Sequence, residues 1–451
     1  MTGMPSEHPD ASQPLVISEH NHPIRRNMLD GDAIFVMRKL NKEGFSSYLV
    51  GGGVRDLYLG KKPKDFDIST NAKPGQIRKI FPHSSTIGRR FRLVQVFFKS
   101  GNLIEISTLR SLSEHDLDGP EAVLAPNNTY GNLPEDAQRR DLSINSLFYE
   151  LESHTIIDYV GGVRDLDNSI IRMVGQPDKR INRDPVRMMR AIRHSARTGF
   201  SIEDETWQSI CRNHQKITLC PTSRIRDELF KDLYGGSAAG WFELAADSSI
   251  FTAIFPFYRN ILTTSPPSQP SCRHQLGALL EILDSINLKA STGECRQLPK
   301  FFILALLLLP WAEITFGLSR LKLKGPAVFQ LSKKLRSEID TLLGTQLNLR
   351  RSIRQEMVIL LSNLPQFVRF VQSNSWPKWL TKKSYFANCL LFAHIRQQAI
   401  SGTEREDNLS SMINGVSHHE PPQPERTQFS RKKTRPAFSP NKKGGVFGFR
   451  K

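Results

Sequence analysis

The stretch Tyr48-Leu-Val-Gly-Gly-Gly-Val-Arg-Asp56, followed by Lys64-Asp-Phe-Asp-Ile-Ser-Thr70, decides the fold of the N-terminal part of this chain. A short apolar strand runs into three glycines, which let the backbone turn sharply and approach a ligand closely. Two aspartates separated by one residue follow. If Phe66 lies in a strand, both carboxylates point to one face of the sheet, while Phe66 and Ile68 point into the core.

The two aspartates, Asp65 and Asp67, are candidate ligands for metal ions. Carboxylate oxygens suit Mg²⁺, and metal ions held by two such groups can clamp the attacking and leaving oxygens of a displacement at phosphorus. An isolated Asp-x-Asp is more often a solvated strand end. The glycine turn favours the catalytic interpretation, because its backbone amides can bind a triphosphate.

The glycine turn differs from the dinucleotide-binding fingerprint Gly-x-Gly-x-x-Gly, because Asp56 stands where the last glycine belongs. The acid pair also comes too early to bind a ribose after a crossover helix. We therefore expect Gly52 to allow a triphosphate to approach the backbone. We expect Arg55 to bind its oxygens through a forked guanidinium.

A second motif, Arg139-Arg-Asp-Leu-Ser-Ile-Asn145, combines two arginines with an acid ahead of an apolar run. Such a group suits a phosphate or sugar contact, although an isolated copy is more often a surface salt-bridge cluster. Asp141 is a candidate third carboxylate, either as a metal ligand or as the group that orients a 3′-hydroxyl. Glu105, on a predicted strand over 103–107, competes for that role.

A third motif, Asn182-Arg-Asp-Pro-Val-Arg-Met-Met-Arg-Ala-Ile-Arg-His-Ser-Ala-Arg197, predicts a helix with an apolar face and an arginine stripe. Asn182 is the expected N-cap. Asp184 and Arg187 are neighbours at i,i+3, and an acceptor beside a forked donor can hydrogen-bond the edge of a base. The alternative is a solvated helix with one ion pair.

The composition indicates a polyanionic partner. The 451 residues carry a formal net charge of +18, with a pI near 9.8, which favours nucleic acid. The five cysteines are scattered, so neither a zinc site nor a disulfide framework is expected. The polar N-terminus does not resemble a secretory signal. The apolar run 301–309 is interrupted by Pro310 and is too short to span a membrane, so we expect a core helix.

The patterns divide the chain into parts. We expect a disordered leader over 1–20 and a catalytic head over 21–150, with a small mixed or antiparallel sheet and helices. Helical periodicity then predicts an α-helical neck over 151–260 and an α-helical body and tail over 261–400. Residues 401–451 are predicted to be disordered. From Arg426 onward they carry no acid, and we interpret them as a basic arm that contacts RNA phosphates.

The four motifs Gly51-Gly-Gly-Val-Arg-Asp56, Asp65-Phe-Asp67, Arg139-Arg-Asp141 and Asp184-Pro-Val-Arg187 together resemble the class II tRNA nucleotidyltransferase and bacterial poly(A) polymerase family. The resemblance spans residues 22 to about 260. It implies a nucleotidyltransferase head followed by helical neck, body and tail. It also implies Mg²⁺-dependent addition of nucleotides from ATP or CTP to RNA 3′ ends. The implied roles are metal binding by Asp65 and Asp67, triphosphate and sugar contacts by Gly52, Arg55 and Arg140, base reading by Asp184 and Arg187, a nucleotide contact by Arg190, and support of the base-reading helix by Arg224 and Glu228.

Within this family, the stretch Ile87-Gly-Arg-Arg-Phe-Arg-Leu-Val-Gln-Val96 is similar to the signature of the polyadenylating branch. Three residues depart from the family pattern: Thr86 stands where an aliphatic residue is usual, Leu109 replaces a phenylalanine, and Arg183 replaces an acid. The last departure bears on how Asp184 and Arg187 are oriented, and so on nucleotide selection.

The leading hypothesis is template-independent transfer of AMP from ATP to RNA 3′ ends. The expected substrates are mRNA, with tRNA and small RNAs as further candidates. We expect a cytoplasmic monomer with no membrane association. Two alternatives stay open: addition of CCA to tRNA, and a non-catalytic RNA-binding protein that kept the fold. The intact acid pair argues against the latter.

Overall fold

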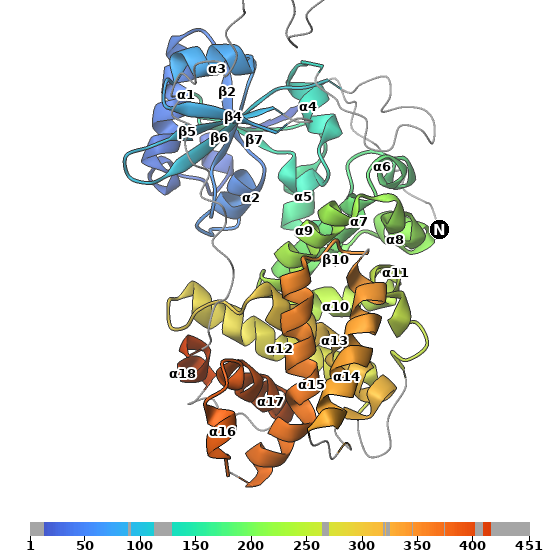
Figure 1. The fold of residues 1–451 in the computed structure, drawn as a ribbon. Helices are drawn as coiled ribbons and strands as arrows, with labels where there is room; N and C mark the ends of the chain where they lie inside the picture. Colours follow the sequence, from blue (N-terminus) through green and yellow to red (C-terminus); the bar gives the residue numbers. More distant parts are fainter. Residues whose placement is uncertain are drawn as a thin grey trace, which may run out of the picture.

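The computed structural model describes residues 13–88, 92–111, 129–263, 270–318, 321, 325–344, 346–373, 375–401 and 409–415. In these residues a mixed sheet with helices forms one end of the molecule, and helices form the rest (Figure 1). The predicted α+β class is therefore confirmed.

The sheet has eight strands in the order β1-β8-β7-β2-β3-β6-β5-β4. Only β3 and β6 pair in parallel, and every other neighbouring pair is antiparallel. The strands are β1 (Leu15–Ile17), β2 (Ser47–Val50), β3 (Asp67–Thr70), β4 (Ser84–Ile87), β5 (Leu93–Phe97), β6 (Leu103–Thr108), β7 (Phe148–Glu150) and β8 (Thr155–Asp158).

The helices of this part follow from local signals. Asp30 caps the first helix by accepting from the amides of Asp32 and Ala33, and Gly44, with φ of 82°, lies just after its end. Its buried side chains pack into the main core with those of the sheet. The helices are α1 (Gly31–Lys42), α2 (Gly52–Tyr58), α3 (Pro74–Ile80), α4 (Leu133–Arg139) and α5 (Gly162–Asp167).

Two predicted boundaries of the head differ from the structure. The predicted disordered leader is wrong for residues 15–17, because β1 pairs antiparallel with β8 at one edge of the sheet. The sheet also extends past the predicted boundary at residue 150, since β8 begins at Thr155. Three-residue edge strands carry too little periodicity to stand out in a sequence.

The neck is mainly helical, but the prediction of helices alone is wrong for the two short strands at 170–171 and 201–202, and the third motif spans two helices. Asn182 lies inside α6, so the predicted N-cap is wrong; Pro185 precedes α7 instead. Residues 184–185 break the helix because proline disfavours a helical conformation in the residue before it. A two-stranded sheet, β9 (Ile170–Ile171) and β10 (Ser201–Ile202), joins this region. The neck helices are α6 (Pro177–Arg183), α7 (Val186–Thr198), α8 (Asp204–Asn213), α9 (Thr222–Leu233), α10 (Ala238–Asp247) and α11 (Ile250–Ile254).

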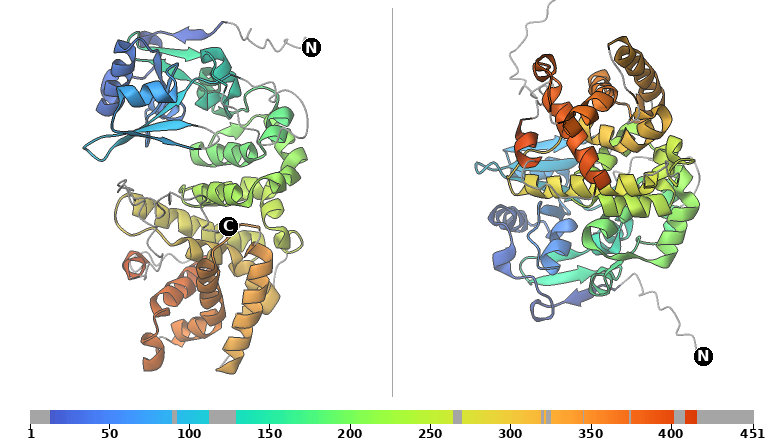
Figure 2. Two further views of the ribbon diagram at one scale, coloured as in Figure 1. Left: turned by 45° about the horizontal axis from the view of Figure 1, so that its top comes forward. Right: turned by 90° about the horizontal axis from the view of Figure 1, so that it is seen from below.

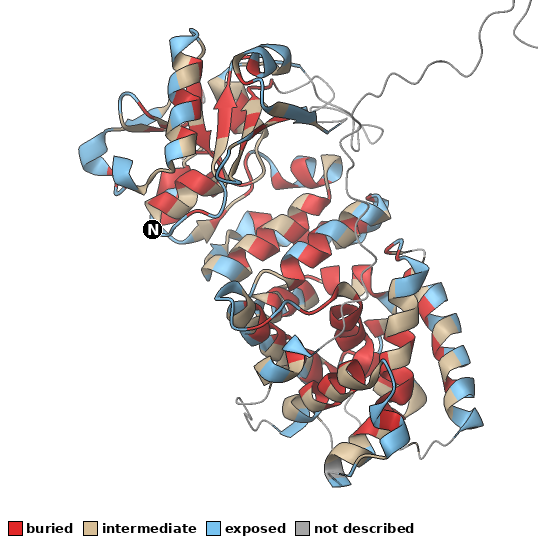
Figure 3. Ribbon diagram, turned by 60° about the vertical axis from the view of Figure 1, so that its left-hand side comes forward, coloured by how far each residue is buried: buried red, intermediate tan, exposed pale blue. Residues whose placement is uncertain are grey.

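The body contains the apolar helix that the sequence predicts. It continues through Pro310 to Phe316, although proline removes a backbone donor. The hydroxyl of Tyr258 bridges the gap: it accepts from the amide of Trp311 at 3.2 Å and donates to the carbonyl of Leu307. The residues of this helix from Phe301 to Ala312 are buried, and buried residues gather inside the helical part of the molecule (Figure 3). The body helices are α12 (Cys272–Ser291), α13 (Lys300–Phe316), α14 (Pro326–Ile339), α15 (Arg351–Ser373), α16 (Lys378–Thr381) and α17 (Phe386–Ser401).

The predicted disorder over 401–451 is wrong for one short stretch, because α18 (Leu409–Asn414) is helical and packs on α17 with Ile413 buried. The basic arm from Arg426 lies outside the described residues. Among the helices of the described ranges, none combines the length and apolarity needed to cross a membrane.

Candidate active site

The pairing of β2 with β3 brings the glycine turn and the acid pair to the same end of these two strands. β2 and β3 are antiparallel with Val50 opposite Asp67, so the turn that leaves β2 lies beside the start of β3. Gly51 takes a φ of 70°, which favours glycine. A Cβ on Gly53 would lie 3.4 Å from the backbone carbonyl of Asp65. The two halves of the opening motif therefore pack directly on each other.

Only one of the two aspartates lies in the strand. β3 begins at Asp67, and Asp65 is an exposed residue of the preceding segment. The prediction that both carboxylates alternate along a strand is therefore wrong for Asp65. The two carboxylates still lie close enough for Asp65 to raise the pKa of Asp67. Phe66 and Ile68 pack on the main core, as predicted.

Glu105 lies next to Asp67. The parallel register pairs Asp67 of β3 with Glu105 of β6, and Gln95 of β5 donates to Glu105 Oε1 at 2.9 Å. Burial, then Glu105, then Asp65 raise the pKa of Asp67 to about 6, against the opposing charge of Arg140. Ionised together, these acids repel one another, so the cluster favours binding of a cation.

The donor set of this cluster fits Mg²⁺, which commonly takes one or two carboxylates together with substrate phosphate oxygens. Among the described residues, no group of three or more potential ligands is already assembled around a single point. An ion held by these carboxylates would complete its coordination with phosphate oxygens of a nucleotide.

Arg140 lies against the glycine turn. Its Nη1 lies 3.6 Å from where a Cβ on Gly51 would be, and its Nη2 donates to Ser69 Oγ at 3.1 Å. Buried Asp136 fixes it through a salt bridge at 2.9 Å, and the guanidinium lies over the Phe148 ring. Its Nη1 also donates to the carbonyl oxygen of Asn145 at 3.3 Å, so each guanidinium nitrogen of Arg140 is bound within the protein while its positive charge lies at the turn.

Arg55 is bound within the protein rather than open to a ligand. Its Nε and Nη2 donate to Asp56, and its Nη1 donates to Asn145 Oδ1 at 2.7 Å. The same Nη1 lies 3.2 Å from His194 Nδ1. The guanidinium lies under the turn, with Nη2 3.4 Å from where a Cβ on Gly52 would be.

Asp141 is paired with the neck. Arg190 Nη1 donates to its carboxylate at 3.0 Å, and Arg190 also lies 3.5 Å from Glu228. Burial would raise the pKa of Asp141, but Arg190 and then Arg187 outweigh it and hold that pKa well below its usual range. Of the two candidates for the third carboxylate, Glu105 lies beside Asp67, whereas Asp141 is the acceptor for Arg190.

Asp184 and Arg187 do not pair through their side chains. Asp184 accepts from Arg224 of α9 at 2.6 Å through Oδ2. Arg187 donates to the backbone carbonyls of Arg140 at 2.9 Å and Arg139 at 3.2 Å. Within the described residues, Asp184 Oδ1 and Arg187 Nε are buried without a hydrogen-bond partner. Buried polar atoms normally form a hydrogen bond, so this acceptor and this donor are available to a ligand.

One pocket of about 360 Å³ collects most of these side chains. It contains six of the nine predicted site residues: Asp67, Arg140, Asp141, Asp184, Arg187 and Arg190. Asp65, Gly52 and Arg55 do not line it and lie at or near the glycine turn. The remaining lining residues are Val50, Leu93, Glu105, Ser107, Arg110, Arg139 and Arg224.

The sequence analysis gave no role to Arg110, Asn145 or His194, and it treated Arg139 only as one of two arginines that suit a phosphate or sugar contact. Arg139, Asn145 and His194 lie inside the second and third motifs, and this position in the sequence is the signal that could have pointed to them. Arg110 is buried and desolvation lowers its pKa to about 10. Its place in the pocket depends on the sheet, which brings β6 beside β3, and no local pattern predicts that neighbour.

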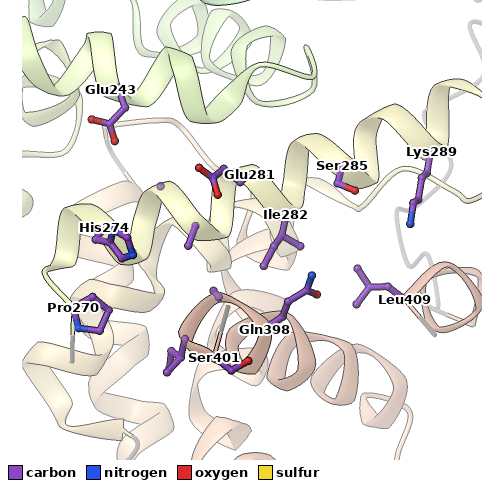
Figure 4. Close-up of a pocket in the computed structure, with 14 residues that line it drawn as sticks. Glu243, Pro270, His274, Glu281, Ile282, Ser285, Lys289, Gln398, Ser401 and Leu409 are labelled. Atoms are coloured by element: carbon purple, nitrogen blue, oxygen red, sulfur yellow. The ribbon is translucent and has the colours of Figure 1, made fainter. Parts of the chain in front are cut away.

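A second hollow, between α12 and α17, contains none of these residues (Figure 4). Its charged side chains are Glu243, Glu281 and Lys289, with His274 at one end. It lacks an arginine, so it suits an anionic nucleotide less well than the pocket beside the sheet.

Comparison with known proteins agrees with this geometry. Residues 47–172 match the family described as the poly A polymerase head domain. Residues 199–262 match the one described as a probable RNA and SrmB-binding site of polymerase A. The chain is 34% identical to the CCA-adding enzyme of Lactobacillus helveticus over 288 residues, which cover 60% of this chain and 71% of that one. The chain therefore belongs to the family of poly(A) polymerases and CCA-adding nucleotidyltransferases.

Within this family, the chain is 41% identical to poly(A) polymerase I of Escherichia coli O6:H1 over 263 residues, which are 57% of this chain and 56% of that one. It is 38% identical to the Haemophilus influenzae protein of the same name over 232 residues, 50% of this chain and 51% of that one. The chain thus spans about half the length of these poly(A) polymerases.

The fold resembles that of the Bacillus stearothermophilus CCA-adding enzyme in complex with CTP. The TM-score is 0.60 at 24% identity, and the match covers 84% of this chain and 80% of that one. This likeness concerns the fold of head, neck and body together.

Proposed function

We propose that the protein is a template-independent poly(A) polymerase that transfers AMP from ATP to the 3′ ends of RNA. The 3′-oxygen attacks the α-phosphorus, the bond to the β-phosphate oxygen breaks, and pyrophosphate leaves. The observation that carries the proposal is the placement of Asp67 and Glu105 at the glycine turn, in one pocket with the base-reading candidates. The higher identity to poly(A) polymerases favours AMP over CCA addition.

Asp65 and Asp67, with Glu105 beside them, would hold Mg²⁺. The bound ion would lower the pKa of the 3′-hydroxyl and neutralise charge on the departing pyrophosphate. This assignment keeps the predicted acid pair and takes Glu105 as the third carboxylate in place of Asp141. Asp141 instead orients Arg190, which in turn lies beside the nucleotide.

Arg140 would bind the triphosphate at the turn, together with the backbone amides near Gly52. Arg55 does not line the pocket, and it would fix the shape of the turn through its bonds to Asp56 and Asn145. Arg110 and Arg139 add positive charge to the same pocket. This excess of arginine over acid suits a substrate with several negative charges.

Asp184 Oδ1 and Arg187 Nε offer one acceptor and one donor without partners. Adenine presents a complementary amino donor and ring-nitrogen acceptor, and cytosine presents the same pair. Guanine and uracil present a carbonyl acceptor and a ring N–H donor, which is the reverse order. The pocket therefore favours ATP and CTP over GTP and UTP. Arg183 ends α6 and does not line the pocket.

The second candidate function is CCA addition, which the match to the L. helveticus enzyme favours. The discriminating experiment offers ATP, CTP, GTP and UTP separately, with a tRNA lacking its CCA end and with an unrelated RNA. Long tails from ATP alone on both RNAs support the proposal. Three nucleotides that require CTP, on the tRNA only, support the alternative.

The acid pair is tested with Asp65→Ala and Asp67→Ala. Each should lose turnover by roughly 100-fold or more while RNA binding persists. Glu152→Ala, at an exposed acid outside the pocket, is the matched control and should keep full turnover. Retained turnover in either aspartate variant would reject the metal assignment. Action on mRNA and other transcripts, and a location in the cytoplasm, remain predictions that depend on this activity.

A further inference from the structure

Two tryptophans three residues apart have opposite surroundings. Trp376 packs in an aromatic cluster, with ring centroids 5.5 Å from Phe367 and 5.2 Å from Phe386. Trp379, in α16, is 54% exposed, although the next residue, Leu380, is fully buried. The aromatic cluster and Leu380 therefore anchor this turn of the chain, and Trp379 projects from it.

The anchoring extends to the backbone. The amide of Leu380 donates to the carbonyl of Pro377 at 2.9 Å, and that of Lys383 donates to Leu380 at 3.0 Å. The amide of Phe386 then donates to Lys383 at 3.0 Å. Because the turn is fixed at both ends, Trp379 is presented on a defined framework, which lowers the entropy cost of binding a ligand on its ring.

Three lysines lie within four residues of Trp379 in the sequence. Lys378, Lys382 and Lys383 are all exposed, and none is ion-paired within the described residues. Lys382 is the C-cap of α16 and follows Trp379 by three residues, the spacing that brings side chains together on a helical turn, and Lys383 comes directly after this C-cap. Neither aspartate nor glutamate occurs between residues 357 and 403. Positive charge and one exposed aromatic ring thus coincide at α16.

We propose that Lys378, Trp379, Lys382 and Lys383, here called the α16 platform, bind single-stranded RNA, with one base stacked on Trp379 and the lysines on neighbouring phosphates. Every base has a π-face, so stacking on an aromatic side chain tolerates any sequence, and a basic surface follows the backbone. A membrane surface fits less well, because interfacial helices insert a long apolar face and α16 has four residues.

The position of the platform gives it a distinct role. α16 lies at the opposite end of the molecule from the sheet (Figures 1 and 2). An RNA whose 3′ end occupies the pocket must be long to reach α16 as well. The inference rests on the proposed function, since it assigns a place to the body of the RNA substrate. It predicts that the platform increases the affinity for long RNA and has no effect on the affinity for a short primer.

The experiment compares KM for a long unstructured RNA with KM for a five-nucleotide oligoadenylate, using the full chain. Trp379→Ala should raise KM for the long RNA roughly tenfold. KM for the oligoadenylate and the kcat values for both RNAs should stay unchanged. Trp379→Phe should keep most of the affinity, whereas Trp379→Leu should lose it, because leucine is apolar but has no π-face. Leu288→Ala, at another exposed apolar residue, is the control and should change neither KM.

The lysines are tested through salt dependence. The affinity for long RNA falls as salt rises. In the double variant Lys382→Glu with Lys383→Glu, a plot of log affinity against log salt should be less steep by about 2. Lys42→Glu with Lys79→Glu reverses two exposed charges on the head and should leave that slope unchanged.

Three results would overturn the inference. One is an unchanged KM for long RNA in Trp379→Ala. Another is an equal rise for long RNA and primer. The third is wild-type binding to phosphatidylserine vesicles that depends on Trp379 while RNA affinity does not. If wild type incorporates no nucleotide, the proposed function fails; equilibrium binding of long RNA to wild type and Trp379→Ala still decides the platform separately.

Discussion

Arg55 of the head and His194 of the neck meet at 3.2 Å, with Nη1 of the guanidinium facing Nδ1 of the ring. Arginine can only donate, so Nδ1 of His194 accepts in this contact, and Asn145 Nδ2 lies 3.3 Å from Nε2 on the other side of the ring. Burial, followed by the charge of Arg55, lowers the pKa of His194 to about 3, so the ring is neutral near pH 7. One contact thus couples the glycine turn on α2 to α7, the helix that begins beside Asp184.

This coupling predicts a role for His194 in positioning. His194→Phe removes the acceptor and should raise KM for ATP roughly tenfold, with a smaller change in kcat. His194→Gln keeps an acceptor and should recover most of that loss. Steady-state kinetics with ATP as the varied substrate provide the measurement, and equal KM values for the two variants and wild type would contradict the idea.

The raised pKa of Asp67 predicts an acid limit for activity. Below about pH 6 this carboxyl is protonated and no longer binds a cation well. At limiting Mg²⁺, kcat/KM should therefore rise with pH through about 6 and level off above 7. Saturating Mg²⁺ should shift the midpoint to lower pH, because the cation competes with the proton. A profile that does not respond to Mg²⁺ concentration would speak against Asp67 as a ligand.

The same shift predicts a gain in stability when the acid is removed. The folded-state pKa of Asp67 lies above its ordinary value of 3.8, so its ionised form is penalised in the folded protein at pH 7. The stability contributed by this group falls as pH rises from about 4 to 6. Asp67→Asn should raise the free energy of unfolding by about 1–2 kcal/mol at pH 7. Denaturant unfolding measures it, and this gain should shrink at pH 4.

Removing the Arg193 side chain in the neck should lower stability, in contrast to the gain expected for Asp67→Asn. Arg193 is 7% exposed and forms ion pairs with Glu228 and Asp232 of α9. Despite burial, Arg193 and Arg190 lower the pKa of Glu228 to about 2, whereas burial raises that of Asp232 to about 7. Arg193→Leu leaves two buried carboxylates without this partner and should cost about 3–5 kcal/mol.

The control for that experiment is Arg212→Leu, which removes an exposed pair with Asp178. Both of its side chains are more than half exposed, so the change should cost less than about 1 kcal/mol. Thermal unfolding of the two variants tests the contrast. Similar melting temperatures would show that the buried pairs do not anchor α7 to α9.

Much of the head could be predicted, because its signals are local. The glycines at 51–53 require a turn, and Ile68, Ile104 and Ile106 alternate with polar residues along their strands, so the sheet and its edge followed from the pattern. The pairing of Glu105 with Asp67 could not be predicted. It depends on which strands become neighbours, and no periodicity within β6 contains that information.

The neck shows a second limit. The spacing of Asp184 and Arg187 predicted that the two side chains are neighbours. Each binds a partner from another element: Asp184 accepts from Arg224 of α9, and Arg187 donates to the backbone carbonyl of Arg140. Spacing along a helix reports which side chains could meet. The partners that they select are set by tertiary packing, which here also leaves His194 half-buried.

The carbonyl oxygen of Arg140 accepts from two neck arginines, Arg180 at 2.6 Å and Arg187 at 2.9 Å. This acceptor belongs to the main chain and survives every substitution at position 140. Scanning mutagenesis will therefore record the loss of the Arg140 guanidinium and overlook the contact with the neck that the main chain of the same residue makes. An ester in place of the amide that follows it, which weakens the carbonyl as an acceptor, would reveal that second role.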